Sequence, residues 1–161
     1  MPIAAGAKLP ADVTGFVMEN EKPTPKTLGD LTAGKTVVMF GVPGAFTPTC
    51  DQEHLPSYVQ ELANLHAKGV DQVICMSMND IFVLQEWNKV SGAASILMLS
   101  DGNGEITNAL DLALDGTGFG LGQRTTRFAL IAEDGTVSAI EVEAKAGECS
   151  VSAAPNILSR L

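Results

Sequence analysis

One short run of residues limits the folds that this chain can adopt. Residues 36–42, with the sequence Thr-Val-Val-Met-Phe-Gly-Val, are almost continuously β-branched, aromatic or otherwise apolar. A strand that faces water on one side alternates apolar and polar residues, whereas a strand that is covered on both faces does not alternate. The run therefore predicts a strand in the middle of an α/β sheet.

The segments after this strand alternate between helical and strand patterns. A turn at Pro43 and Gly44 precedes Thr47, which we expect to cap a helix whose first residue is Pro48. The elements that we expect from there are a helix, a strand, a helix, a strand, a hairpin and a terminal helix, over residues 48–68, 73–76, 80–90, 96–99, 127–142 and 153–161. This order resembles a thioredoxin-like α/β fold, with a central mixed β-sheet flanked by helices.

Turn-forming residues mark where we expect elements to end or bend. Pro23 and Pro25 predict a turn after a strand or hairpin edge over residues 12–18. Pro56 should kink or divide the first long helix, because proline lacks the N–H of a helical hydrogen bond, and Gly69 should end that helix.

Two further patterns have ordinary structural explanations. On the second long helix Val83, Leu84, Trp87 and Val90 predict one apolar face, so Trp87 should pack in the core or in an interface. Residues 116–122 are rich in glycine, but the glycines do not follow the spacing of a nucleotide-binding loop and no clear strand precedes them. We therefore expect a flexible loop there.

The length and charge of the chain exclude several classes of protein. Its 161 residues suit a single domain over residues 1–161, and 45% of them are hydrophobic, which is enough for a packed core. A formal net charge of −9 does not provide the basic surface that nucleic-acid binding requires. No apolar run approaches the length of a membrane span. We expect neither nucleic acid nor a membrane as a partner.

The three cysteines, Cys50, Cys75 and Cys149, form neither a CxxC pair nor a metal-binding spacing. So few cysteines are typical of a reducing compartment, where disulfide scaffolds are rare. The N-terminus shows no signal-peptide pattern. We expect a cytoplasmic protein, or an organellar one whose transit peptide has been removed.

Cys50 holds the position best suited to thiol chemistry. It is the third residue of the helix that we expect to leave the C-terminal end of the central strand. Catalytic sites of open α/β sheets gather at this end of the strands, and unpaired N–H groups at a helix N-terminus favour a thiolate over a thiol. Only the thiolate is a strong nucleophile, so Cys50 is the candidate catalytic residue; the alternative is an inert cysteine packed in the core.

Motifs along almost the whole chain resemble one family. Residues 43–50, Pro-Gly-Ala-Phe-Thr-Pro-Thr-Cys, resemble the PxxxTxxC signature of peroxiredoxins, in the form of the peroxiredoxin 5 (type II) subfamily. Further segments similar to that subfamily follow in its order, at residues 54–56, 77–87, 124–128, 133–135 and 154–157. The resemblance implies a thiol peroxidase that reduces hydrogen peroxide and alkyl hydroperoxides and needs no metal, haem or flavin cofactor.

The resemblance also implies roles for four residues. Cys50 would attack one peroxide oxygen as the peroxidatic thiolate and become a sulfenic acid. Thr47 would hydrogen-bond the thiolate and the peroxide, and Pro43 would shield Cys50 from solvent. Arg127, which precedes Phe128 as in the family's motif, would favour the thiolate and polarise the O–O bond.

Two other residues are candidates for supporting roles. Arg124 competes with Arg127 for the active-site position and would otherwise support the site or another surface. His54 lies four residues after Cys50, so a helix would bring both onto one face as a Cys–His pair or half of a metal site. A zinc site needs three or four protein ligands, and no others have a suitable spacing. We expect a structural His54, in a dimer interface or at the rim of the active site.

The sequence leaves open how the sulfenic acid is reduced. Plant type II relatives use a cysteine in the sequence context of Cys75, although we expect Cys75 to be buried in a strand. Animal peroxiredoxin 5 uses one near Cys149, which lies in a polar loop, but in those relatives it stands closer to the Ala-Pro-Asn segment. A one-cysteine cycle, with glutathione, glutaredoxin or thioredoxin as reductant, is equally open.

The family resemblance further implies a homodimer that packs through surfaces near the active site. Two other functions fit a thioredoxin-like fold with a reactive cysteine. The first is a binding or chaperone module in which Cys50 only senses oxidation. The second is a thiol–disulfide oxidoreductase, which the missing CxxC pair disfavours.

Overall fold

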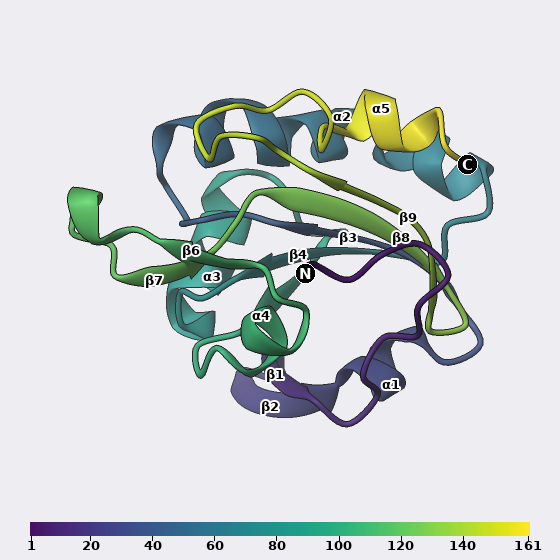
Figure 1. Ribbon diagram of the computed structural model, residues 1–161, viewed down its shortest axis with the longest axis horizontal. Helices are drawn as coiled ribbons and strands as arrows, with labels where there is room; N and C mark the ends of the chain where they lie inside the picture. Colours follow the sequence, from purple (N-terminus) through teal and green to yellow (C-terminus); the bar gives the residue numbers. More distant parts are fainter.

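A seven-stranded mixed sheet forms the centre of the molecule (Figure 1). The computed structural model describes residues 1–161, and the strands lie in the spatial order β2-β1-β5-β4-β3-β8-β9. Their bounds are Thr14–Glu19 (β1), Lys22–Thr27 (β2), Thr36–Gly41 (β3), Gln72–Ser77 (β4), Leu97–Ser100 (β5), Phe128–Glu133 (β8) and Thr136–Val142 (β9). The predicted central mixed sheet is confirmed.

β3 is the central strand that the apolar run predicted. It pairs in parallel with β4 and antiparallel with β8, and all of its residues except Thr36 are buried. Because β4 also pairs in parallel with β5, the C-terminal ends of β3, β4 and β5 lie at one edge of the sheet. The chain leaves β3 toward Cys50 at this edge, where catalytic sites of open α/β sheets are found.

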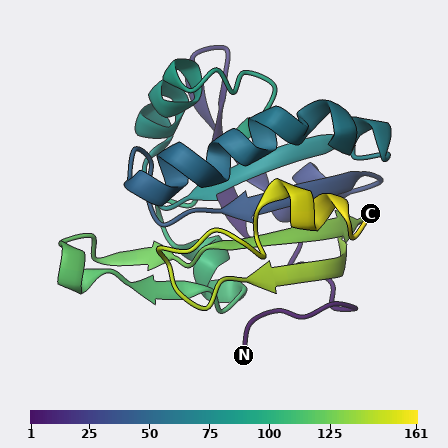
Figure 2. The ribbon, with the colours of Figure 1, turned by 90° about the horizontal axis from the view of Figure 1, so that it is seen from above.

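Helices cover both faces of the sheet (Figures 1 and 2). One face is covered by α2 (Leu55–Ala67), α3 (Ile81–Val90) and α5 (Ala154–Leu158), the other by α1 (Leu28–Thr32) and α4 (Glu105–Ala109). Val38 and Phe40 of β3 join the first core, whereas Val37 and Met39 join the second. No helix is both long enough and apolar enough to cross a lipid bilayer.

The helix that carries Cys50 begins irregularly. Residues 48–49 are α-helical, Cys50–His54 form a π-helical turn, and α2 follows directly. The Leu55 N–H donates to the Cys50 carbonyl, five residues earlier, and Pro56 has no N–H to donate. The helix is therefore divided next to Pro56 into a π-helical turn and α2, as predicted from the proline.

The predicted turn at Pro23 and Pro25 is wrong, because both residues belong to β2. An edge strand has one unpaired side, so a proline there costs no hydrogen bond of the ladder. The turn lies just before, at Asn20 and Glu21, whose φ angles of 50° and 63° suit a tight hairpin.

The glycine-rich residues 116–122 form a loop, as predicted, but a short strand precedes it, contrary to the prediction. They form the tip of a small antiparallel hairpin of β6 (Ala113–Asp115) and β7 (Gln123–Thr125), with a 3₁₀ turn at Thr117–Phe119. In both ribbon views this hairpin projects beyond the edge of the main sheet (Figures 1 and 2). It brings the residues of the tip next to the loop that leaves β3.

The predicted apolar face of α3 is only partly correct. Leu84 and Trp87 are buried, together with Ile81, but Val83 and Val90 are 37% and 62% exposed. The buried face is therefore turned by about one residue position relative to the prediction.

Candidate active site

Cys50 lies in the first turn of the helix that follows β3, and its side chain is fully buried. It belongs to the apolar layer between the sheet and α2. A glycine is required where the chain leaves β3, because a Cβ at Gly41 would lie 2.1 Å from the ring of Phe128 on β8. This close packing brings the start of β8 against the Cys50 segment.

The guanidinium group of Arg127 contacts the Cys50 sulfur directly. Arg127 immediately precedes β8 and is only 2% exposed. Its Nη2 donates to Cys50 Sγ, its Nη1 donates to His54 Nδ1 and its Nε donates to the Ala146 carbonyl. The donor–acceptor distance is 3.0 Å in each of the three. A fixed positive charge at this distance favours a thiolate over a thiol. Arg127, rather than Arg124, is therefore the arginine at the sulfur.

Asn79 and Arg124 hold the loop between β3 and Cys50. The Ala45 N–H donates to Asn79 Oδ1 (2.8 Å), and Arg124 Nη1 donates to the Pro43 carbonyl (3.2 Å). Arg124 Nε also donates to the Leu121 carbonyl in the hairpin tip (2.9 Å). Arg124 thus links the hairpin to the loop, and it makes no hydrogen bond to the sulfur.

Thr47 precedes the first helical residue, Pro48, as predicted, but its side chain does not cap the helix. The hydroxyl donates to the Gly44 carbonyl (2.6 Å), and no hydrogen bond joins it to Cys50. The hydroxyl proton is donated to the Gly44 carbonyl. The lone pairs of the hydroxyl oxygen can therefore still accept a hydrogen bond from a bound molecule.

His54 holds Arg127 in place; it is fully buried and does not lie at a rim or a surface interface. Its Nε2 lies 3.1 Å from the Ser152 carbonyl, while Nδ1 faces Arg127. A carbonyl only accepts and a guanidinium only donates, so the ring is neutral with its proton on Nε2. Burial and the charge of Arg127 lower the pKa of His54 to about 3. No group of three or more His, Cys, Asp or Glu side chains that could hold a metal ion is present.

Glu143 and Ser152 complete this arrangement, and no pattern in the sequence pointed to either. Glu143 Oε2 accepts from the N–H groups of Ser150 and Ser152 (2.8 Å each) and from the Ser152 hydroxyl (2.6 Å). Burial acts to raise the pKa of Glu143, but hydrogen bonds from the two serines outweigh it, and the pKa lies below its ordinary value. The Ser152 carbonyl also accepts from the Tyr58 hydroxyl of α2 (2.7 Å).

Comparisons with known proteins show the family of the chain. Residues 4–158 match the Redoxin family. Peroxiredoxin-2B of Arabidopsis thaliana is 43% identical over 161 residues, which cover 99% of each chain. The chloroplastic peroxiredoxin-2E-2 of rice is 44% identical over 164 residues, which cover 99% of this chain and 72% of the relative. The crystal structure of reduced Prx3 from Vibrio vulnificus in complex with hydrogen peroxide is 43% identical, covers 98% of each chain and superposes with a TM-score of 0.93.

The chain belongs to the peroxiredoxins of the type II (peroxiredoxin 5) kind. This peroxiredoxin is a thiol-dependent peroxidase with a thioredoxin-like fold, and Cys50 is its peroxidatic cysteine. Its substrate is a peroxide and its reductant a thiol. The family, fold and activity that the sequence motifs predicted are confirmed.

The other two cysteines of the peroxiredoxin are poor nucleophiles as they lie here. Cys75 is fully buried in β4, and burial raises its pKa well above the ordinary value. Cys149 is partly buried rather than exposed, and burial raises its pKa to about 11. All three cysteines are free thiols. Neither Cys75 nor Cys149 offers a ready thiolate to a sulfenic acid on Cys50.

A cavity of about 300 Å³ opens beside the guanidinium group of Arg127. Its lining comes from the loop after β3, the hairpin and the C-terminal segment: Pro43, Thr47, Pro48, Thr49, Leu114, Asp115, Gly116, Phe119, Leu121, Arg127, Ala146 and Gly147. Most of its exposed lining is apolar, and Phe119 at the tip is 89% exposed. This cavity is the opening in the protein surface that lies beside Arg127 and the loop that leads to Cys50.

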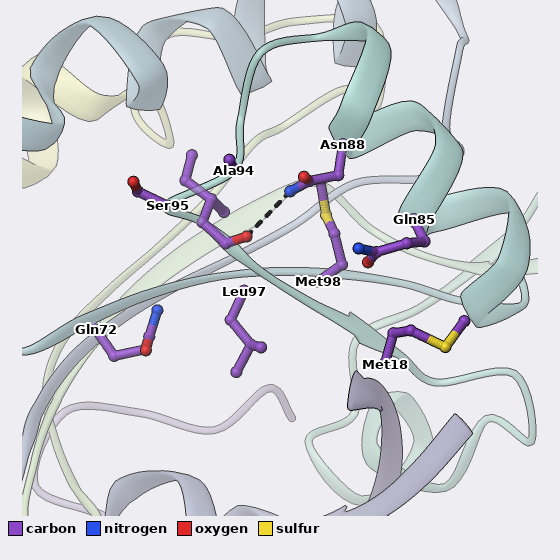
Figure 3. Close-up of a pocket in the computed structure, with 9 residues that line it drawn as sticks. Met18, Gln72, Gln85, Asn88, Ala94, Ser95, Leu97 and Met98 are labelled. Carbon is purple, nitrogen blue, oxygen red and sulfur yellow. Dashed lines mark hydrogen bonds between the residues drawn. The ribbon is translucent and has the colours of Figure 1, made fainter. Parts of the chain in front are cut away.

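A second cavity, of about 290 Å³, lies between α3 and the strands β4 and β5 (Figure 3). Amide and thioether side chains, among them Gln72, Gln85, Asn88 and Met98, line it. No cysteine, histidine, lysine, arginine or carboxylate side chain lines it, and none of the three cysteines faces it.

The neutral, buried His54 predicts a loss of stability in mild acid. The unfolded chain takes up a proton near the ordinary pKa of 6.5, whereas the folded chain does not until about pH 3, so stability is present above pH 6.5 and is lost as the pH falls. We expect the free energy of unfolding to fall as the pH drops below about 6.5, with a slope that approaches about 1.4 kcal/mol per pH unit near pH 5. Urea titrations across this range measure the slope. His54→Asn should flatten it, and equal slopes in the two proteins would contradict the neutral ring.

Proposed function

We propose that Arg127, Thr47 and Pro43 complete the peroxidase site around Cys50. The observation that supports this most strongly is the 3.0 Å contact between Arg127 Nη2 and Cys50 Sγ. The guanidinium group is buried and held by three hydrogen bonds, so its charge is fixed before the peroxide arrives. Peroxide consumption by the Cys50 and Arg127 variants described in the Discussion tests the assignment.

In the proposed step the Cys50 thiolate attacks one oxygen of the peroxide. A sulfur–oxygen bond forms as the O–O bond breaks, and the leaving oxygen takes up a proton to become water or an alcohol. Sulfur gives two electrons and becomes a sulfenic acid. Negative charge moves from the sulfur to the leaving oxygen. A guanidinium group has several N–H donors, so it can hydrogen-bond to both atoms as the charge moves.

Thr47 and Pro43 would position the peroxide. The Thr47 hydroxyl donates to the Gly44 carbonyl, and its oxygen is free to accept from a peroxide O–H in the cavity. Pro43 forms part of the apolar wall beside Arg127, where it would keep water from the sulfur. Both residues lie on the loop that Arg124 and Asn79 hold.

We propose that an external thiol, rather than Cys75 or Cys149, reduces the sulfenic acid while the fold stays as described. The support is the burial of both cysteines and their raised pKa values. The first external thiol would form a mixed disulfide with Cys50 and release water. A second thiol would then restore Cys50 and leave as a disulfide. Glutathione, glutaredoxin and thioredoxin are the candidate reductants.

The cavity lining supports alkyl hydroperoxides as substrates besides hydrogen peroxide. Leu114, Phe119 and Leu121 form an apolar wall on the hairpin, against which a hydrocarbon group would pack. We expect Phe119→Ala to lower kcat/KM for cumene hydroperoxide about threefold to tenfold, and to change the value for hydrogen peroxide less than twofold. Steady-state assays with both peroxides check this, with the remote Phe82→Ala as a matched control. Equal losses with both peroxides would contradict a wall that contacts only the alkyl group.

We also propose that this peroxiredoxin forms a homodimer through a surface near the active site. An exposed aromatic side chain supports a dimer surface near the site: Phe46 is 50% exposed and its ring lies 6.3 Å from that of Trp87. Trp87 Nε1 donates to Asp51 Oδ1 (2.8 Å), next to Cys50, so a partner seated on Phe46 would contact the active-site helix.

We propose a cytoplasmic or organellar location for the protein. The rice relative is named chloroplastic, which supports the organellar alternative.

A further inference from the structure

One buried carboxylate, that of Glu143, takes no part in the proposed chemistry. It is 5% exposed and lies just after β9, nearly a hundred residues along the chain from Cys50. We propose that Glu143 is a positioning residue of the peroxidase, which folds residues 143–152 so that their carbonyl groups hold Arg127 and His54 at the Cys50 sulfur. This inference rests on the role proposed for Arg127.

Three backbone carbonyl groups of residues 143–152 accept hydrogen bonds from side chains at the active site. The Ala146 carbonyl accepts from Arg127 Nε (3.0 Å), and the Ser152 carbonyl accepts from the His54 ring (3.1 Å). The Gly147 carbonyl accepts from the Thr49 hydroxyl (2.9 Å), beside Cys50 in the chain. The direction of the guanidinium group thus depends on the path of this segment.

Glu143 determines that path. The segment contains no helix or strand between β9 and α5, and most of its residues are at least partly exposed. Both oxygens of the carboxylate are occupied, Oε2 by three donors and Oε1 by the Ser150 hydroxyl (3.1 Å). All four donors come from Ser150 and Ser152, so the carboxylate joins the two ends of the segment. The backbone N–H of Glu143 donates to the Arg127 carbonyl (3.0 Å), so the start of the segment lies beside the arginine.

The Glu143 carboxylate forms no ion pair with Arg127. No ion pair with an acidic side chain forms at Arg127, and only a sulfur, a ring nitrogen and a carbonyl contact its guanidinium group. A carboxylate in direct contact would compete with the thiolate for the N–H donors. Because Glu143 instead acts through neutral carbonyl groups, it orients the guanidinium group and leaves Nη2 for the sulfur.

Glu143→Ala, Glu143→Gln and the surface control Glu148→Gln test this proposal. Glu148 lies in the same segment, but its carboxylate pairs only with Lys145 at the surface. The readouts are the rate of Cys50 oxidation by hydrogen peroxide and the pH dependence of Cys50 alkylation by iodoacetamide, each in a background without Cys75 and Cys149. Alkylation reports the thiolate without any peroxide chemistry, and both are measured on folded protein, well below the melting temperature.

We expect Glu143→Ala to slow Cys50 oxidation about tenfold to a hundredfold and to move the alkylation profile to higher pH. Glu143→Gln keeps an oxygen that accepts from the two N–H groups and should restore part of the rate, while Glu148→Gln behaves like the parent. If Glu143→Ala fails to fold, Ser152→Ala removes one of the four hydrogen bonds and should produce a smaller shift in the same direction. Parent-like rates and profiles in the folded Glu143 and Ser152 variants would overturn the proposal.

A double variant separates this inference from the proposed function. If Glu143 acts through Arg127, adding Glu143→Ala to Arg127→Gln should change the oxidation rate less than twofold. Fully multiplicative losses would mean that Glu143 acts elsewhere and would overturn the positioning role, with the function of Arg127 intact. A parent-like Arg127→Gln variant would instead refute the proposed function on which this inference rests.

Discussion

Cys50→Ser is expected to reduce peroxide consumption to the level of buffer alone, a loss of more than about a thousandfold. A serine hydroxyl is not ionised at neutral pH, and its oxygen cannot take up and give back a peroxide oxygen as a thiolate sulfur does. The buried site itself should survive, because Ser and Cys have nearly the same shape. Stopped-flow mixing of reduced protein with hydrogen peroxide measures the first turnover directly.

The other two cysteines provide the controls for this variant. Cys149→Ser changes a partly buried thiol in the C-terminal segment and should leave the first turnover unchanged. Cys75→Ser should also retain it, although a hydroxyl in the core of β4 is expected to lower the melting temperature. Fast peroxide reduction that persists in Cys50→Ser would show that another residue is the nucleophile.

Arg127→Gln has the second largest expected effect. The substitution removes the charge beside the sulfur and replaces the three guanidinium nitrogens that donate to Ala146, His54 and Cys50 with a single amide group. We expect the rate of Cys50 oxidation to fall about a hundredfold to a thousandfold, since both the thiolate and the leaving oxygen lose their donor. Alkylation of Cys50 should also require a higher pH in the variant.

Arg160→Gln is the matched control, because Arg160 is a surface arginine that pairs with Glu141. Its oxidation rate and alkylation profile should equal those of the parent protein. If Arg127→Gln were as fast as Arg160→Gln, the contact between guanidinium and sulfur would have no catalytic consequence.

The sequence predicted those parts of the fold that are encoded locally. The apolar run at residues 36–42 identified β3, since a strand that is covered on both faces needs no polar partner positions. The hairpin expected over residues 127–142 is formed by β8 and β9, and both residues of its tight turn, Asp134 and Gly135, have positive φ angles. Gly69, with a φ of 96°, ends the long helix as expected. The position of Cys50 in its helix followed from the same local signals.

Features that depend on distant parts of the chain could not be predicted. The roles of His54 and Glu143 arise from contacts with Arg127 and Ser152, and neither residue has a local pattern that indicates a partner. β2 was missed because prolines oppose a strand except at an edge, and the edge is defined only by the complete sheet. Two strands of three residues each, β6 and β7, are too short for a periodic pattern.

Mapping the first oxidised sulfur tests the central claim most directly. Reduced protein is mixed with one equivalent of hydrogen peroxide in the presence of dimedone, which traps sulfenic acids, and the labelled peptides are identified by mass spectrometry. We predict dimedone on Cys50, with Cys75 and Cys149 still thiols. A bridge between Cys50 and either cysteine would overturn the external-thiol route alone. Dimedone on Cys75 or Cys149, with Cys50 unreacted, would contradict the assignment of Cys50 as the sulfur that meets the peroxide.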